Sequence, residues 1–360
     1  FQDCKVPVEN LLGEQGKGHV IAFNILNIGR VKLGAGVLGG VRSVTSLSIK
    51  YSTDRKQFGV SINTFGAIKS KLAEMATKIF ATESLCYRAG QDIEDRMVAL
   101  AEEGLPDAEA KLKALEQFAI EAAIAKVHGS EVLDYVVDQG VQIYGGMGYS
   151  ADAPMERAYR DARISRIYEG TNEINRMLMV GMVLKRAMKG EINLFEPAMA
   201  VAAELTSVPS FESIDASELF AVEKDILKKL KKVFLMVGGK AAMSLQDRIE
   251  DEQEIMMNLA DVMIEIYAAE SAILRAEKIA LKDGEESAKN QIAMAKIYLY
   301  EATDKIGASA KEAIVSFAKG DEQKVLLMGL KRFTKPDFIN VKELRRQVAD
   351  YMIAQGKYPF

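Results

Sequence analysis

The sequence predicts an all-α protein that consists of two helical bundles. Apolar residues recur at helical spacing from Ile21 onward, and few stretches show the alternation of apolar and polar residues that marks a strand. Residues 189–216 contain prolines and several serines, which is typical of a linker. Similar numbers of helical runs lie on either side, so the pattern predicts one bundle at 19–188 and a second at 217–360.

The composition is that of a globular protein with enough apolar material for a core. Hydrophobic residues make up 49% of the 360 residues and charged residues 27%, with a net charge of -4. No basic stripe with interleaved aromatic residues occurs, so we expect no nucleic-acid partner. Two cysteines and two histidines argue against a disulfide framework or a metal cluster and favour a reducing compartment. No run of eighteen apolar residues occurs, so no transmembrane helix is expected.

The individual elements follow from the same spacing. Residues 1–18 carry Pro7, three glycines and short apolar pieces, which suit the end of a strand followed by a loop. The passage 141–172 is rich in glycine and is expected to be irregular. Helices are predicted at 19–52, 64–103, 107–139, 171–188, 217–247, 251–283, 285–319 and 340–356.

The stretch VKLGAGVLGG at Val31–Gly40 contains the G-x-G-x-x-G spacing of dinucleotide-binding turns at Gly34, Gly36 and Gly39. That fingerprint binds a pyrophosphate only where it joins a strand to a helix. The preceding letters FNILNIGR show no strand alternation, and the helical spacing continues through the glycines. We therefore expect these small residues to allow close packing between helices, although glycine lowers helix propensity.

Most familiar catalytic signatures are missing. The chain has no H-E-x-x-H, no G-x-S-x-G, no C-x-x-C and no complete Walker A motif. His128 lies in a helical run near Lys126, where a packing or surface role is expected. A centre that depends on histidine is therefore not favoured.

A passage before the linker carries candidate chemistry. Arginines recur every three residues from 157 to 166 and lead into YEGTNEINR at Tyr168–Arg176. Gly170 is expected to interrupt the helix and Thr171 to cap the next one, which leaves Glu169 in a connector. A carboxylate held there against an apolar pocket would have a raised pKa and could act as a general base. The alternative is that Glu169 forms an ion pair with a nearby arginine.

Four stretches in order resemble the C-terminal portion of an acyl-CoA dehydrogenase, a flavoprotein that oxidises fatty acyl-CoA thioesters. They are VPVENLLGEQGKG (6–18), DRKQFG (54–59), QIYGGMGY (142–149) and RDARISRIYEGTNEI (160–174). The part beyond about residue 190 resembles, by layout, the additional C-terminal helical domain of the very-long-chain branch. The resemblance implies that residues 1–18 are the remnant of a β domain. We expect such a portion to bind FAD weakly by itself and to be inactive.

The resemblance implies FAD-dependent α,β-dehydrogenation of a long-chain acyl-CoA to a trans-2-enoyl-CoA in fatty-acid β-oxidation. Glu169 matches the general base that removes the α-proton while a hydride passes from the β-carbon to the flavin. Some relatives carry the base one position before the arginine that matches Arg30, and here that position is Gly29, which has no side chain. In the family the thioester carbonyl is polarised by the backbone N–H of the base and by a flavin hydroxyl.

The resemblance also implies contacts with the cofactor and the substrate. Arg55 and Phe58 match contacts to the adenosine and pyrophosphate end of FAD in the partner subunit, where arginine suits phosphate oxygens. The remaining cofactor contacts implied are Gln142, Ile143, Tyr144, Gly145 and Gly146 along the same part of FAD, and Thr171 and Glu173 from the same subunit. The substrate contacts implied are Asn27, Arg30, Tyr168 and Gly170, with a buried ion pair as the alternative role of Arg30.

The partners implied are an acyl-CoA substrate, an electron-transferring flavoprotein and a second copy of the chain, as a dimer. The location implied is the cytoplasm of a bacterium, or the matrix or inner-membrane surface of a mitochondrion. The alternatives are an acyl-CoA oxidase, which passes electrons to oxygen, and a non-catalytic helical assembly protein that retains the fold. Residues 222–234 form a basic amphipathic pattern, which suits peripheral membrane contact or a stripe that faces the core.

Overall fold

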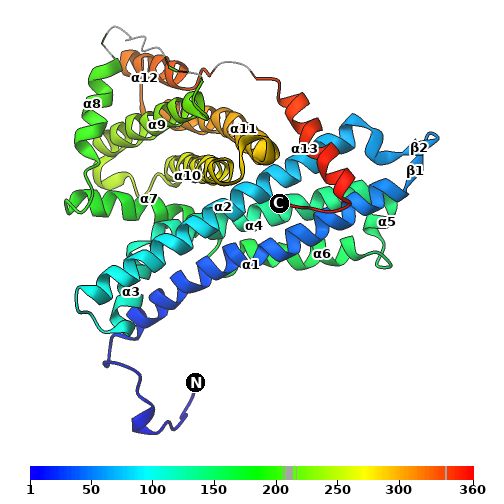
Figure 1. Ribbon diagram of the computed structural model, residues 1–360. Helices are drawn as coiled ribbons and strands as arrows, with labels where there is room; N and C mark the ends of the chain where they lie inside the picture. Colours follow the sequence, from blue (N-terminus) through cyan, green and yellow to red (C-terminus); the bar gives the residue numbers. More distant parts are fainter. Residues whose placement is uncertain (206, 208–213, 216, 337–338) are drawn as a thin grey trace.

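The computed structural model describes residues 1–205, 207, 214–215, 217–336 and 339–360, and this part of the chain is almost entirely helical (Figure 1). The all-α prediction is confirmed. The strands in the described part are β1 (Lys56–Gln57) and β2 (Val60–Ser61), which pair antiparallel with Lys56 opposite Ser61. This short hairpin lies between the two longest helices, α1 (Gly18–Asp54) and α2 (Gly66–Glu102), and protrudes at one end of the molecule.

The other helices follow in chain order. In the first half they are α3 (Asp107–Gln117), α4 (Ala119–Tyr144), α5 (Gly146–Tyr149), α6 (Pro154–Ala162) and α7 (Asn172–Met188). In the second half they are α8 (Phe195–Leu205), α9 (Ala221–Leu245), α10 (Gln253–Asp283), α11 (Glu285–Phe317), α12 (Gly320–Phe333) and α13 (Val341–Gln355). Single turns of 3-10 helix are η1 (Val8–Asn10), η2 (Ile62–Thr64), η3 (Arg163–Arg166) and η4 (Gln246–Arg248).

Four expectations for these elements are corrected. Residues 1–18 contain η1 and no strand, and the predicted helix 107–139 is divided into α3 and α4 at Phe118. The predicted linker contains α8, whose Pro197 lies in the first turn, where proline is tolerated because no intrahelical N–H bond is lost. Residues 206, 208–213 and 216 of that linker lie outside the described residues. The helix α12 was not predicted.

Close packing between α1 and α4 explains Gly34 of the false fingerprint, whereas a Cβ added at Gly36 or Gly39 would meet no atom within 4 Å. A Cβ added at Gly34 would lie 2.7 Å from the carbonyl oxygen of Ala125 on α4, and one added at Gly129 would lie 3.1 Å from the Cα of Gly34. The fingerprint therefore lies inside α1, and the packing expectation is confirmed for Gly34. Among the described helices, α1 alone has the length and hydropathy of a membrane span, but core helices pass the same test.

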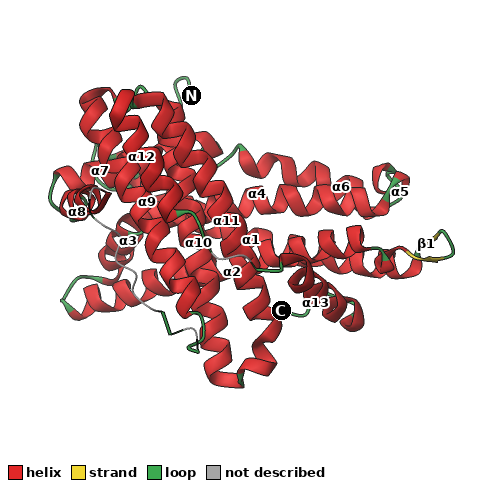
Figure 2. Cartoon of the chain, turned by 90° about the horizontal axis from the view of Figure 1, so that it is seen from above, coloured by secondary structure: helices red, strands yellow, loops and turns green. Residues whose placement is uncertain are grey.

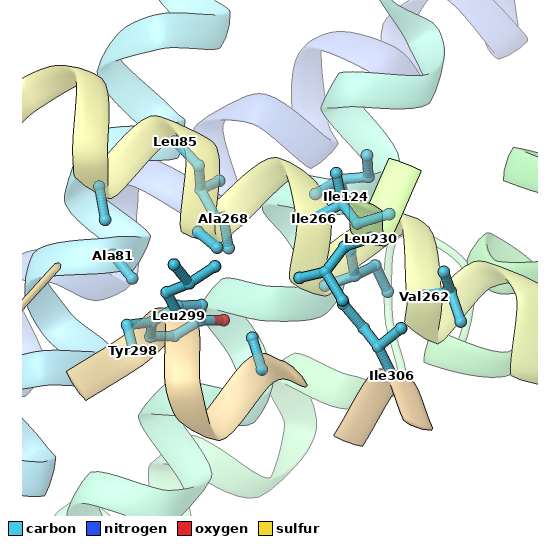
Figure 3. Close-up of a cluster of buried hydrophobic side chains, with 14 of the residues drawn as sticks. Ala81, Leu85, Ile124, Leu230, Val262, Ile266, Ala268, Tyr298, Leu299 and Ile306 are labelled. Atoms are coloured by element: carbon cyan, nitrogen blue, oxygen red, sulfur yellow. The ribbon is translucent and has the colours of Figure 1, made fainter. Parts of the chain in front are cut away.

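One hydrophobic core contains residues from both halves of the described chain. Helix α2 contacts α1 and α4 on one side and α10, α11 and α13 on another, so both halves share it as a wall (Figures 1 and 2). Figure 3 shows Leu85 of α2, Ile124 of α4, Leu230 of α9, Ile266 of α10 and Leu299 of α11 converging in this core. The division into two bundles stays a prediction.

The basic amphipathic pattern at 222–234 belongs to α9, and its apolar stripe is buried. Ile226 and Leu230 are in the core, while Lys224 pairs with Glu277 and Lys232 pairs with Glu204. The stripe therefore faces the core, and this apolar face is not available to a membrane. Lys224 thus links α9 to α10, and Lys232 links it to α8.

Candidate active site

Glu169 lies in the connector between η3 and α7, as the sequence predicts. Its backbone adopts the left-handed conformation with φ of 60°, and Gly170 follows with φ of 81°. A non-glycine residue in that conformation is uncommon and is often found at functional sites. The Thr171 side chain then accepts a hydrogen bond from the Ile174 N–H at 3.3 Å, so the predicted N-cap is confirmed.

The Glu169 side chain is half-buried against α1. A Cβ added at Gly29 would lie 2.6 Å from the carboxyl carbon of Glu169, so the absence of a side chain at residue 29 makes the space that this carboxylate occupies. The carboxylate borders a cavity of about 620 Å³. Its walls are mainly apolar and come from α1, α4 and α6, with Leu33, Val37, Val44, Leu133, Val137, Ala158 and Ala162 among the lining residues.

The backbone of Glu169 is held from two sides. Arg30 donates a hydrogen bond from Nε to the Glu169 carbonyl oxygen at 3.3 Å, and Asn175 donates to the same oxygen at 3.4 Å and to the Gly170 carbonyl at 2.8 Å. Within the described residues, the Glu169 N–H carries no hydrogen bond. This connector thus presents a carboxylate and a free N–H donor from the same residue.

The expected arginine partners of Glu169 pair elsewhere. Arg160 pairs with Glu156 at 2.9 Å, and Arg166 pairs with Asp134 at 2.8 Å. No ion pair of Glu169 occurs among the residues that the structure describes. The ion-pair alternative for Glu169 is therefore not supported.

Asn27 and Arg30 are both buried beneath the connector. Arg30 is 5% exposed, and it donates from Nη1 to the Asn27 side-chain oxygen at 2.9 Å. Burial lowers the pKa of Arg30, and the charge of Glu169 opposes that shift. No carboxylate forms an ion pair with Arg30 in the described chain, so the alternative of a buried ion pair is not found. Their contacts are with each other and with the connector, and contact with a substrate stays a prediction.

The other residues expected near Glu169 lie around it at the surface. Tyr168 is 48% exposed and lines the cavity, and Gly170 lies next to Arg30. Glu173 is exposed in the first turn of α7, where hydrogen bonds from its own backbone and from Thr171 lower its pKa. An ionised Glu173 therefore stabilises the start of the helix that follows the connector.

A second group of expected residues lies where α1 and α4 end, beside the hairpin. Arg55 is exposed, and its guanidinium has no hydrogen bond or ion pair within the described residues. Phe58 occupies the hairpin turn with φ of 52°, and its ring is 92% exposed. Tyr51 of α1 stacks on Tyr144 of α4 with 3.9 Å between ring centroids, which joins the two helix ends.

The backbone of the segment after α4 has free space around it. Gly145 has φ of 60°, and a Cβ added at Gly145 or Gly146 would meet no atom within 4 Å. Gln142 is exposed, whereas the Ile143 side chain is in the hydrophobic core. The side chain of Ile143 is therefore unavailable to a ligand, and its expected contact would have to use the backbone. A free guanidinium, an exposed aromatic ring and open glycine backbone suit the phosphates and base of a nucleotide.

The two groups of residues are far apart in one chain. Arg30 and Arg55 lie on and just after the continuous helix α1, and twenty-five residues of helix span about 37 Å. Figure 1 shows the hairpin at one end of α1 and the chain's N-terminal segment at the other. The structure therefore brings together Glu169, Arg30 and Asn27 at one site, and Arg55, Phe58 and Gly145 at another.

Sequence reasoning missed Lys126 as part of the site. Its side chain on α4 is 0% exposed, and its Nζ donates to the Asn172 side-chain oxygen at 2.6 Å at the start of α7. The only local signal is a lysine within the small and apolar residues AIAKVHGS at 123–130. The contact with Asn172 spans 46 residues, so no short pattern could reveal it.

Two family models match the chain. Both are described as the C-terminal domain of acyl-CoA dehydrogenase, and they match residues 16–184 and 229–332. The first region contains every candidate site residue named above.

Individual relatives and a solved structure give the same result. The chain is 43% identical to a "Probable acyl-CoA dehydrogenase" of Bacillus subtilis over 99% of its own length and 60% of that protein. It is 31% identical to the mitochondrial very long-chain specific acyl-CoA dehydrogenase of Rattus norvegicus, over 93% of this chain and 50% of that protein. An acyl-CoA dehydrogenase from Bacillus anthracis, crystallised in complex with FAD, matches with a TM-score of 0.94 and 42% identity, over 99% of this chain and 60% of that one.

The chain thus spans half to three fifths of the length of these relatives. The higher identity to the bacterial protein means that the match does not favour the very-long-chain branch over others. The expectation that the chain is the C-terminal portion of a longer enzyme is not established by these matches.

Proposed function

Because the chain belongs to the acyl-CoA dehydrogenase family, we propose that it takes part in the FAD-dependent α,β-dehydrogenation of an acyl-CoA thioester, with Glu169 as the general base. The product is the trans-2-enoyl-CoA, and the pathway is fatty-acid β-oxidation. The relative from Bacillus anthracis binds FAD, and we propose the same cofactor for this chain.

One observation carries the proposal: Glu169 offers both a base and a hydrogen-bond donor at the same point. Its carboxylate is aimed at a mainly apolar cavity, and its N–H is free within the described residues. An α-proton of a thioester is too weakly acidic for a carboxylate in water. A donor that binds the thioester oxygen as negative charge develops there lowers this barrier, because it acts where water is excluded.

The left-handed backbone at Glu169 and Gly170 supports this double role. It turns the connector sharply, so the carboxylate and the N–H are not covered by a continuing helix. Arg30 and Asn175 hold the Glu169 carbonyl on the other side, which fixes the direction of the N–H. Pre-organised donors of this kind need no reorientation during the reaction.

Arg55, Phe58 and the backbone at Gly145 and Gly146 would hold the adenosine and phosphate end of FAD. When bound, FAD supplies the hydride acceptor for the β-carbon, which no side chain of this protein can provide. Since these residues lie about 37 Å from Arg30 along α1, we propose that they serve the Glu169 site of a second copy. A homo-oligomer, with a dimer as its unit, follows from this arrangement.

The substrate proposed is a long-chain acyl-CoA. The cavity of about 620 Å³ beside Glu169 has mainly apolar walls and no bulky side chain at Gly36 and Gly40 of α1, so it suits a hydrocarbon tail. The electron acceptor proposed is an electron-transferring flavoprotein.

Replacement of Glu169 by Gln in the flavin-loaded enzyme tests the proposal. Glutamine keeps the size and the backbone N–H but cannot accept the α-proton, so the rate of dye reduction with palmitoyl-CoA should fall roughly 10²–10⁴-fold. Bound flavin and the melting temperature should stay near those of the wild type. The matched control is Glu156→Gln on α6, where the carboxylate forms only a surface pair with Arg160. An unchanged rate in Glu169→Gln would remove this residue from the mechanism.

A further inference from the structure

Lys126 is a buried cation without a counter-charge in direct contact. Its side chain is 0% exposed, and it donates to the neutral amide oxygen of Asn172 at 2.6 Å. Asn172 in turn donates to Ser130 at 3.0 Å and to Glu131 at 3.1 Å. No ion pair of Lys126 occurs among the described residues, which makes it unlike the many surface lysines that pair with carboxylates.

Such a cation opposes folding. An ammonium group that moves from water to a neutral acceptor loses more hydration free energy than the new hydrogen bond supplies. Burial accordingly lowers the pKa of Lys126 to about 8 from its ordinary value of 10.5. A methionine of similar shape would fill the same space at no such cost, so the lysine is not explained by packing.

The charged groups that face Lys126 come from each surrounding element. They are Glu131 on α4 itself, Glu173 on α7, Arg30 on α1 and Glu169 in the connector. Glu131 is bound by Arg176 at 2.7 Å, and Glu173 is engaged at the start of α7. Of these four charges, Glu173 acts most strongly on the pKa of Lys126 and Glu169 least.

We propose that Lys126 is a positioning residue for the Glu169 base, because its hydrogen bond fixes Asn172, the first residue of α7. The inference rests on the proposed role of Glu169. Asn172 lies three residues after Glu169, so its anchorage sets where the connector ends.

The test replaces Lys126 by Met and by Gln in the flavin-loaded enzyme and measures kcat and KM. Lys126→Met removes the donor to Asn172, so the connector loses its anchor, and kcat should fall about tenfold while KM changes little. Lys126→Gln keeps a donor for Asn172, so it should recover most of kcat.

The matched control is Lys78→Met. Lys78 on α2 is also largely buried with a lowered pKa, but the groups that face it are Lys305, Glu301, Glu265 and Glu74. This variant should leave kcat near that of the wild type.

Stability separates positioning from a merely structural role. Below pH 8 the buried charge of Lys126 lowers the free energy of unfolding of the wild type. Lys126→Met should therefore melt at the same temperature as the wild type or at a higher one. This difference should shrink between pH 8 and 10.5, where the lysine becomes neutral in both states. A lower melting temperature together with a wild-type kcat would overturn the inference. Loss of activity in Glu169→Gln combined with a wild-type kcat in Lys126→Met would leave the proposed function intact and reject only the role of Lys126.

Discussion

At the scale of single residues, the site depends on Glu169 and equally on the lack of a side chain at Gly29. The carboxylate occupies the volume that a side chain at residue 29 would take. In steric terms, a side chain at residue 29 and the Glu169 carboxylate in its present position exclude each other.

We therefore predict that Gly29→Ala impairs catalysis without unfolding the protein. The added Cβ would lie 2.6 Å from the carboxyl carbon, so the Glu169 side chain must move by roughly an ångström. Displacement of a catalytic group on that scale lowers kcat/KM by roughly 10–100-fold. Steady-state kinetics of the flavin-loaded variant measure the effect.

Gly39→Ala on the same helix is the control, because its added Cβ meets no atom within 4 Å and alanine favours the helix. Adding Glu169→Asp to Gly29→Ala should restore part of the activity, since aspartate is shorter by one methylene. Wild-type kinetics in Gly29→Ala would show that the carboxylate does not use this space.

Local sequence was enough to predict the connector but not its surroundings. The glycine at 170 and the threonine at 171 carry short-range signals for a break and a cap, and both are found. The hydrogen bond from Arg30 to the Glu169 carbonyl spans 139 residues, and Lys126 reaches Asn172 across 46. Contacts of that range depend on how helices pack, which a single sequence does not reveal.

At the scale of helices, α4 is joined to the second half through buried polar groups. His128 on α4 lies 3.1 Å from the Thr82 hydroxyl of α2 and 2.8 Å from the Tyr298 hydroxyl of α11, which is drawn in Figure 3. Tyr298 donates to Glu265 at 2.8 Å, and Lys305 donates to the same carboxylate at 2.7 Å. The His128 ring therefore bridges the hydroxyl groups of Thr82 and Tyr298, between α2 and α11.

This arrangement predicts a specific sensitivity to acid. Burial lowers the pKa of His128 to about 4 from 6.5. Between these values the unfolded chain binds a proton that the folded chain does not, so stability falls as pH decreases from 6.5 to 4 and then levels off. The total loss from this group is about 3 kcal/mol. Urea unfolding at several pH values should show a flatter dependence in His128→Gln, which keeps a donor for Tyr298.

The control for this measurement is His19→Gln, since His19 is exposed near the start of α1. It should leave the pH dependence of unfolding unchanged. Identical slopes for His128→Gln and the wild type would mean that other groups cause the acid sensitivity. The packing role expected of His128 from the sequence is confirmed by its 6% exposure.

The helices themselves were predicted well where apolar spacing was long and uninterrupted. Helices α1, α2, α10 and α11 lie within a few residues of their predicted limits. Helix α8 was missed because Pro197 and neighbouring prolines and serines suggest a linker, yet a proline in the first turn does not prevent a helix. The split at Phe118 was missed because the apolar spacing of α3 continues into α4 across a single residue.

At the scale of the whole molecule, the two groups of expected ligand residues lie at opposite ends of α1. The resemblance already implied that Arg55 and Phe58 contact FAD in a partner subunit, and the length of α1 agrees with that expectation. A composite site formed by two copies reconciles the distance with the proposed cofactor. The short hairpin that carries Phe58 extends beyond the helices, as a contribution to a neighbouring copy requires (Figure 1).

Mixing two inactive variants tests this arrangement. Glu169→Gln should bind FAD but lack turnover, and Arg55→Glu should lose FAD because a carboxylate repels the phosphates. In a hybrid dimer, the Arg55 of the first variant and the Glu169 of the second would meet in one intact site. Differently tagged copies, purified as the hybrid, should regain flavin absorbance and turnover.

Hybrids that contain two copies of the same variant, with different tags, are the controls and should stay inactive. Failure of the mixed hybrid to recover activity, although each variant forms dimers, would contradict a site shared between copies.

The core that runs unbroken through α2 has a consequence for inherited variation. Because the larger hydrophobic core contains residues from both halves of the described chain, damage in α10 or α11 also weakens the support beneath the distant connector. A substitution such as one at Leu299 would then reduce the amount of folded protein in a cell.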